Sequence, residues 1–325
     1  MLILTQKEIK KVLPLSKISK VIEAVERAFF DYGKKKVQMP PKMYLHFKEF
    51  NGDLRIMPSF SETLNMAGTK LVNVHPENPK KGLLTVMAVI ILNDPKTGIP
   101  LALMDGTWIT ALRTGAASAV ATQYLAKKEA KTLGVVGAGF QALTQIVAIS
   151  KVRRLKEILV YDINEKAIEN LKNILAREKI KVEKGRLIEV CQKEILVTAT
   201  PAKEPIVQSE WILPGTHINA IGADAPGKEE LEPKILTKAK IVIDCWNQAS
   251  HSGEINVPLA KGIIQRENIY SELGEIVSRE KPGRENEKEI TVFDSTGLAI
   301  QDLYTANLVY QLAKRKKIGR KIEIV

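Results

Sequence analysis

Cysteine is nearly absent from this chain, which has only Cys191 and Cys245 among 325 residues. Two cysteines without C-x-x-C spacing are not expected to form a disulfide framework or a zinc site. The four histidines show no H-x-x-x-H spacing, so no metal is expected. This cysteine usage is typical of a protein that works in a reducing, cytoplasmic compartment.

Long hydrophobic runs and aromatic residues are also scarce. The longest apolar run, residues 82–92, is far shorter than the roughly 20 residues that cross a bilayer, and no cleavable leader is expected at the start of the chain. Aromatic residues make up 5% of the chain, so its net charge of +12 lacks the stacking residues of many nucleic-acid binders. We interpret the scattered lysines as solvated surface residues. Neither a membrane nor a nucleic acid is therefore expected as a partner.

The most informative stretch that is present covers residues 131–162. The β-branched run 132–136 precedes Gly137 and Gly139, which begin a G-x-G-x-x-A pattern, and apolar residues at helical spacing follow. A second apolar run then ends at Asp162. This order of strand, glycine turn, helix, strand and acid predicts a dinucleotide-binding unit with the helix N-terminus facing the phosphates.

Each residue of the motif has its own part in this prediction. Gly137 permits the tight turn, and Gly139 has no side chain to keep a pyrophosphate away from the backbone. Asp162 is placed to accept hydrogen bonds from both ribose hydroxyls and to repel a 2′-phosphate, so NAD is expected rather than NADP. The alternative is a strand-to-helix turn that binds nothing, but the strand, the helix and the acid all favour nucleotide binding.

The length of the chain allows two domains. Residues 1–118 combine a helix with hairpin strands, including 67–74 and 83–92, whereas strands alternate with helices over 119–298. The expected fold class is therefore α/β. It consists of a doubly wound, parallel Rossmann sheet over 119–298 and an α+β domain over 1–118, which a C-terminal helix at 299–325 completes.

Four cations lie in or beside apolar stretches of the first domain: Lys42, Arg55, Lys70 and Arg113. Lysine and arginine seldom lie inside strands unless they are paired, so this group predicts an anion pocket for a substrate carboxylate. Lys70 is the only charge between residues 67 and 74, which favours a functional role. Lys42 alone fits equally well an edge-strand lysine that faces water.

One carboxylate is a candidate for acid–base chemistry. Asp224 follows the apolar strand 217–221 and precedes Ala-Pro-Gly. Ligands of doubly wound sheets bind at such carboxyl ends of strands, so Asp224 is expected to act on the substrate. The alternative is that it caps a helix that begins near Gly227.

Several segments together resemble the ornithine cyclodeaminase/μ-crystallin family over essentially the whole chain. They are residues 55–58, 68–76, 111–117, 137–142, 222–228 and 293–297. Within the family, residues 40–42, 253–256 and 296–302 most resemble the archaeal alanine dehydrogenase branch. The resemblance implies a homodimer whose N-terminal domain carries the substrate site and the dimer interface.

The resemblance also implies roles for matching positions. Lys70 matches the catalytic lysine of the family, and Asp224 matches its active-site aspartate. Lys42 and Arg113 match cations around the substrate carboxylate, and Arg113 also lies near the cofactor phosphates. Where ornithine cyclodeaminases have a glutamate for the distal ammonium of ornithine, this chain has Arg55, which is expected to repel that ammonium and to bind a carboxylate.

The activity that the resemblance implies is NAD-dependent, reversible oxidative deamination of L-alanine to pyruvate and ammonia, and a small amino acid or 2-oxo acid is the expected substrate. The alternatives are a ketimine or imine reductase or amination of another small 2-oxo acid, then cyclodeamination of L-ornithine to L-proline, then non-catalytic ligand binding of the μ-crystallin type. The residues expected to contact NAD are Arg113, Thr114, Gly137, Gly139, Phe140, Gln141, Asp162, Ile163, Asn164, Thr200, Ile221, Gly222 and Thr296.

Overall fold

The computed structural model describes residues 1–324, and these divide into two compact units. Unit 1 comprises Met1–Arg113 and the chain from Leu298 onward, and unit 2 comprises Thr114–Gly297. The first division falls inside helix α3 (Thr107–Leu125), at residue 113, whereas the sequence analysis placed it at residue 118.

Unit 1 is built on a mixed sheet with the strand order β16-β1-β7-β6-β5-β4-β2, in which β3 also pairs with β4. Its strands are β1 (Leu2–Leu4), β2 (Val37–Gln38), β3 (Met43–Phe47), β4 (Gly52–Ser61), β5 (Met66–Val74), β6 (Val86–Asn93), β7 (Pro100–Asp105) and β16 (Arg320–Lys321). Antiparallel hairpins join β3 to β7 in sequence order. The turn between β3 and β4 includes Asn51, which has the left-handed backbone (φ 45°) that asparagine tolerates.

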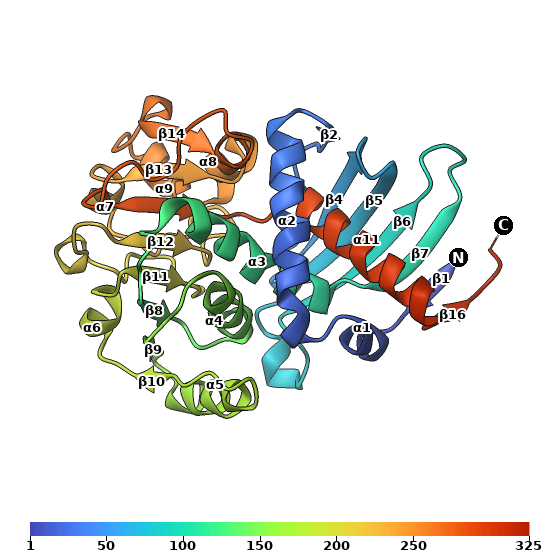
Figure 1. Ribbon diagram of the computed structural model, residues 1–325, viewed down its shortest axis with the longest axis horizontal. Coiled ribbons are helices and arrows are strands. Elements are labelled where there is room, and N and C mark those ends of the chain that lie inside the picture. The colour runs from blue at the N-terminus through green and yellow to red at the C-terminus, as the bar shows by residue number, and fades with distance from the viewer. Residues whose placement is uncertain (325) are drawn as a thin grey trace. The chain divides into compact units, whose positions relative to one another are not determined.

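Helices cover one face of this sheet. Besides the first part of α3 they are α1 (Gln6–Val12), α2 (Ile18–Gly33) and α11 (Ala299–Lys316). Figure 1 shows α11 lying across β4, β5 and β6 with α2 beside it, and these elements are in contact. Met57 of β4, Lys70 of β5 and Ile90 of β6 are cross-strand neighbours and therefore share one face of the sheet. Ala299 packs against Met57, which shows that this is the face covered by α11.

Two predictions about unit 1 need correction. The C-terminal helix expected at 299–325 ends at Lys316, because Lys317 has a left-handed backbone (φ 53°) and Arg320–Lys321 then pair with β1. Val325 lies outside the described residues. The strand expected from residue 83 begins only at Val86, after a 3₁₀ turn at Asn78–Lys81.

Unit 2 contains a sheet in which every pairing is parallel, with the order β10-β9-β8-β11-β12-β15-β13-β14. Its strands are β8 (Thr132–Val136), β9 (Glu157–Tyr161), β10 (Glu183–Lys184), β11 (Ile195–Thr198), β12 (His217–Ala220), β13 (Lys240–Ile243), β14 (Ile269–Glu272) and β15 (Thr291–Asp294). The strand order reverses at β8, since β9 and β11 lie on its two sides. The doubly wound parallel sheet is thus confirmed, and ligands of such sheets bind at the carboxyl ends near the reversal.

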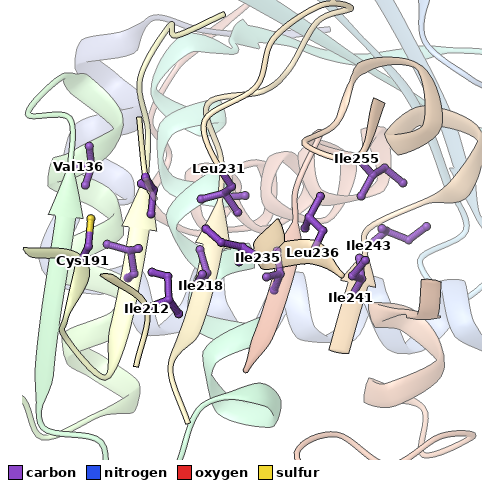
Figure 2. Packing of buried hydrophobic residues seen from close by; sticks show 14 of the residues in the cluster. Val136, Cys191, Ile212, Ile218, Leu231, Ile235, Leu236, Ile241, Ile243 and Ile255 are labelled. Atoms are coloured by element: carbon purple, nitrogen blue, oxygen red, sulfur yellow. The ribbon is translucent and has the colours of Figure 1, made fainter. Parts of the chain in front are cut away.

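Short connections and an apolar core hold those strand ends in place. The helices of unit 2 are α4 (Phe140–Val152), α5 (Glu165–Arg177), α6 (Leu187–Cys191), α7 (Pro233–Leu236), α8 (Trp246–Ser252), α9 (Asn256–Ala260) and α10 (Leu273–Val277). Figure 2 shows Ile218 and Ile241 of the sheet among buried residues of the connections, such as Leu231 and Leu236. Strands buried in this way on both faces read as continuous apolar runs, which is why the sequence predicted them. In residues 1–324, no helix is long and apolar enough to cross a membrane.

Candidate functional site

The glycine turn after β8 has the geometry of a phosphate-binding loop. Gly137 has a φ of 102°, and a Cβ atom there would lie 2.6 Å from the carbonyl oxygen of Ala199. Gly139 is the N-cap of α4 and offers no side-chain cap, and a Cβ there would meet nothing within 4 Å. The fold itself therefore requires the first glycine, whereas the second leaves space for an anion at the N-terminus of a 13-residue helix.

Asp162 lies after β9 and is tied to this loop. Its Oδ2 accepts a hydrogen bond from the backbone N–H of Ala138 (2.6 Å), and its Oδ1 accepts one from the N–H of Asn164 (2.7 Å). A carboxylate oxygen has two acceptor sites, so these bonds orient the group and leave capacity for ribose hydroxyls. Ile163 is 92% exposed and Phe140 is 49% exposed, and both are apolar surfaces that a nucleotide could cover.

A buried glutamate holds together the loops after β11 and β12. Glu230 Oε1 accepts hydrogen bonds from the N–H and the hydroxyl of Thr200, both at 2.7 Å. Its Oε2 accepts from the N–H of Gly222 (2.8 Å) and the hydroxyl of Thr198 (2.7 Å). Thr200 and Gly222 are both expected cofactor residues, so Glu230 fixes their backbone. Sequence reasoning missed Glu230, and no motif or spacing marks it.

Glu254 lies next to Glu230 and supports it in turn. Its Oε1 accepts from the backbone N–H groups of Glu230 (2.9 Å) and Leu231 (2.6 Å). Burial raises the pKa of Glu230, and burial together with the charge of Glu230 raises the pKa of Glu254 well above its ordinary value. Gly253 must be a glycine here, because a Cβ would lie 2.3 Å from Oδ2 of Asp294. The segment 253–256, quoted above for the family resemblance, thus shapes this buried carboxylate cluster.

Two further expected residues also follow strands of this sheet. The N–H of Thr296, after β15, donates to Asp244 Oδ2 at 2.7 Å. Asp224, after β12, forms an ion pair with Lys228 (2.6 Å) and its side chain is 34% exposed. The chain makes a turn at Gly227 where a helix was the alternative, so the helix-cap interpretation of Asp224 is wrong.

The remaining expected cofactor residues of unit 2 lie in or at the start of helices, or directly after a strand. They are Thr114 in α3, Gln141 in the first turn of α4, Asn164 at the N-cap of α5 and Ile221 after β12. Asn164 accepts a hydrogen bond from the N–H of Lys166 (3.1 Å), so its side chain caps α5. Ile221 donates its N–H to the carbonyl of Thr198 (2.9 Å), which extends the pairing of β11 with β12.

Six charged residues of unit 1 are together called the cationic cluster here. Lys70 and Arg113 pair with Asp302, and the charge of Lys42 also acts on Lys70. Arg55 pairs with Asp53 on β4, two residues before Met57, the cross-strand neighbour of Lys70. Lys70 lies on β5 and is 2% exposed. Its Nζ is 2.6 Å from Oδ2 of Asp302 and 3.5 Å from the hydroxyl of Thr110.

Asp302 serves two cations at once. The Nε of Arg113 donates to Asp302 Oδ1 at 3.0 Å, and its Nη1 donates to Gln301 Oε1 at 3.0 Å. Asp302 and Gln301 both come from α11, near the end of the chain. Sequence reasoning missed both residues as members of the site, although they lie in the segment 296–302 quoted for the resemblance.

Lys70 is adjusted for proton transfer near neutral pH. Burial, together with the charges of Arg113 and Lys42, lowers the pKa of Lys70 to about 7, while Asp302 opposes the shift. A lysine with this pKa can accept and release a proton at physiological pH, which an ordinary surface lysine cannot.

Arg55 is paired within the protein. Its Nε and Nη2 donate to the two oxygens of Asp53 at 3.0 and 3.1 Å, and its guanidinium lies 5.4 Å from the ring centre of Tyr44. Lys42 is half-buried just before β3. With four cations against two carboxylates, the cationic cluster retains a surplus of positive charge when Lys70 is protonated. Such a surplus attracts an anionic ligand.

Comparisons with known proteins match nearly the whole chain. A family model described as "Ornithine cyclodeaminase/mu-crystallin family" matches residues 2–317. An alanine dehydrogenase of Archaeoglobus fulgidus is 48% identical over 99% of this chain and 98% of its own length. A solved archaeal alanine dehydrogenase dimer with bound NAD is 47% identical, with a TM-score of 0.95 over 100% of this chain and 99% of that one. A Thermococcus litoralis Δ1-pyrroline-2-carboxylate reductase, solved with NADH and L-proline, is 42% identical, with a TM-score of 0.96 over 99% of this chain and 100% of that one.

Proposed function

Because this chain belongs to the ornithine cyclodeaminase/mu-crystallin family, we propose that it is an NAD-dependent oxidoreductase that deaminates L-alanine. In this reaction L-alanine, NAD⁺ and water give pyruvate, ammonium, NADH and a proton, and the reverse reaction aminates pyruvate. The observation that carries the proposal is Lys70, a buried lysine with a pKa of about 7 inside a cluster of cations. That arrangement fits a substrate with a carboxylate next to a carbon that gains or loses an amine.

NAD is the cofactor proposed for unit 2. The open space at Gly139 and the N-terminus of α4 suit its pyrophosphate, and Asp162 suits the ribose hydroxyls. When bound, NAD accepts the hydride that leaves the Cα carbon of the substrate. The carboxylate of Asp162 would repel the 2′-phosphate of NADP, which is why NAD is the preferred form.

The cationic cluster is proposed to bind and activate the amino acid. Lys42, Arg55 and Arg113 hold the substrate carboxylate, and Arg55 in addition excludes a second ammonium on the substrate side chain. Lys70 takes a proton from the water that adds to the substrate imine and gives it to the departing amine. Asp224 is proposed to orient that water or the amine.

A second candidate function is the reduction of a small cyclic imine. Its support is the likeness to the Thermococcus litoralis reductase, which is 42% identical to this chain. A cyclic imino acid also has a carboxylate beside its C=N carbon, so the cationic cluster suits it equally. Ornithine cyclodeamination is less favoured because the guanidinium of Arg55 would face the distal ammonium of ornithine. Ligand binding without turnover is less favoured because it requires no proton transfer, and so gives no role to the buried Lys70.

The test is a substrate panel followed by NADH absorbance. L-Alanine with NAD is expected to produce NADH, and pyruvate with ammonium is expected to consume it. L-Ornithine, D-alanine and Δ1-pyrroline-2-carboxylate are assayed in parallel. Proline and ammonia formed from ornithine would refute the role assigned to Arg55, whereas imine reduction without alanine oxidation would favour the second candidate.

A homodimer is proposed through the outer face of the unit 1 sheet. Met43, Ile56, Leu71 and Val89 are successive cross-strand neighbours on β3 to β6, and they point away from α11. An apolar row on the uncovered face of a sheet is typical of an interface. Leu71→Glu is expected to give monomers in light scattering, whereas Ile99→Glu, on an exposed turn, is the control. A dimeric Leu71→Glu variant would place the interface elsewhere.

A further inference from the structure

Asp302 is the one carboxylate that contacts both Lys70 and Arg113 in the cationic cluster of the described chain. We propose that Asp302 is a positioning residue, which holds these two cations together and sets the pH at which Lys70 accepts a proton. The inference rests on the proposed function for its activity readout only. Asp302 is not expected to touch the substrate, because its effect passes through Lys70.

The geometry lets Asp302 pair with both cations at the same time. One oxygen lies 2.6 Å from Lys70 Nζ, and the other accepts from Arg113 Nε at 3.0 Å, so the two cations occupy different oxygens. Asp302 is buried and lies on α11, a helix packed across the strand that carries Lys70. A carboxylate held by a helix cannot follow one cation away from the other, so each cation limits how strongly Asp302 stabilises the other one.

The charges around Lys70 determine the sign of each effect. Asp302 of α11 favours the ammonium form, while Arg113 of α3 and Lys42 before β3 disfavour it. The cross-strand neighbours of Lys70, Met57 and Ile90, are uncharged. Loss of the Asp302 charge must therefore lower the pKa of Lys70 below its present value of about 7. Loss of the Arg113 charge must raise that pKa, because it removes a repulsion and leaves Asp302 to Lys70 alone.

The experiment follows the titration of Lys70 in the full-length protein without substrate. Lysines are labelled with ¹³C at Cε, and the Lys70 signal is assigned as the one lost in Lys70→Arg. Asp302→Asn is expected to move the Lys70 titration at least one pH unit lower, and Arg113→Gln at least half a unit higher. Asp302→Glu keeps the charge and is expected to restore most of the shift. Asp31→Asn is the matched control, since it removes another buried carboxylate of unit 1, one that contacts Tyr304 and Arg27.

The outcomes separate this inference from the proposed function. If Lys70 is the base, the acidic limb of the kcat/KM profile, which reports the enzyme without substrate, must shift to lower pH in Asp302→Asn by the same amount as the titration. An unchanged or raised titration in Asp302→Asn would overturn the inference, whatever the activity. Should Asp302→Asn not fold, an unchanged titration in Arg113→Gln would overturn it instead. Correct titration shifts without alanine turnover would leave the inference standing and remove the proposed function.

Discussion

The two units bury their charges in opposite ways. In unit 1, Lys70 and Arg113 share the carboxylate of Asp302, so side chains of opposite charge satisfy one another. In unit 2, both oxygens of Glu230 and one oxygen of Glu254 accept hydrogen bonds instead from backbone N–H groups and threonine hydroxyls. Backbone donors are fixed by the fold, whereas an ion pair can exchange its partner for a ligand. The cationic cluster is therefore suited to bind and to change protonation, and the buried carboxylates are suited to hold loops in shape.

The largest effect is expected in the cationic cluster, at Lys70. Lys70→Ala removes the group proposed to transfer the proton, so kcat should fall by about 10³-fold. The affinity for NAD should stay unchanged, because Gly139 and Asp162, which are proposed to face its pyrophosphate and ribose, lie in unit 2. Steady-state kinetics and a calorimetric titration with NAD measure the two quantities, and Lys96→Ala on an exposed turn is the control. Retained turnover, or a loss of NAD binding, would show that Lys70 is not the proton-transfer group.

Removal of a buried carboxylate in unit 2 should change the conformation of two loops rather than a proton transfer. Glu230→Ala leaves the N–H groups of Thr200 and Gly222 without their acceptor, so the melting temperature should fall by an amount equivalent to about 3–4 kcal/mol. NAD binding should weaken with it, because both loops lose their anchor. Thermal melts and NAD titration report these effects. A variant with normal stability and normal NAD affinity would show that the loops hold their conformation without Glu230.

Substitution of the first glycine of the loop should affect stability, and substitution of the second should affect NAD binding. Gly137→Ala places a Cβ 2.6 Å from the carbonyl oxygen of Ala199 at a φ of 102°, so it should cost about 1–3 kcal/mol of stability. Gly139→Ala meets nothing within 4 Å, so it should leave the melting temperature unchanged and weaken NAD binding about tenfold, or roughly 1.4 kcal/mol. Thermal melts with and without NAD compare the variants. Equal NAD affinity in Gly139→Ala and the wild type would place the pyrophosphate elsewhere.

The same comparison explains which parts of the fold and the site could be predicted from the sequence. The dinucleotide unit was predictable because local order carries it: the apolar strands, Gly137, Gly139 and Asp162 all lie within residues 131–162. Lys70 was predictable as the only charge in an apolar strand. In both cases the signal lies within a short stretch of chain, where periodicity and spacing can be read directly.

The partners that complete each cluster were not predictable in the same way. Asp302 forms an ion pair with Lys70 although the two residues are 232 positions apart in the chain. Glu230 binds backbone groups, and backbone donors have no sequence signature at all. Arg55 was expected to bind a substrate carboxylate, yet its neighbour Asp53 occupies two of its donors, an i, i+2 pairing on one strand that depends on side-chain direction. The positions of the side chains in the folded chain, which local patterns do not give, decide which charges are left for a ligand.

The smallest effect is expected at Glu254, and it depends on pH. The pKa of Glu254 is raised in the folded state, so between the unfolded and folded values the folded chain binds the extra proton and stability falls as pH rises. Glu254→Gln cannot ionise, so its stability relative to the wild type should increase as pH rises above the ordinary pKa of a glutamate. Melting curves at several pH values measure this, with the exposed Glu204→Gln as the control that tracks the wild type. Parallel stability curves for Glu254→Gln and the wild type would mean that Glu254 does not change its protonation state over the pH range tested.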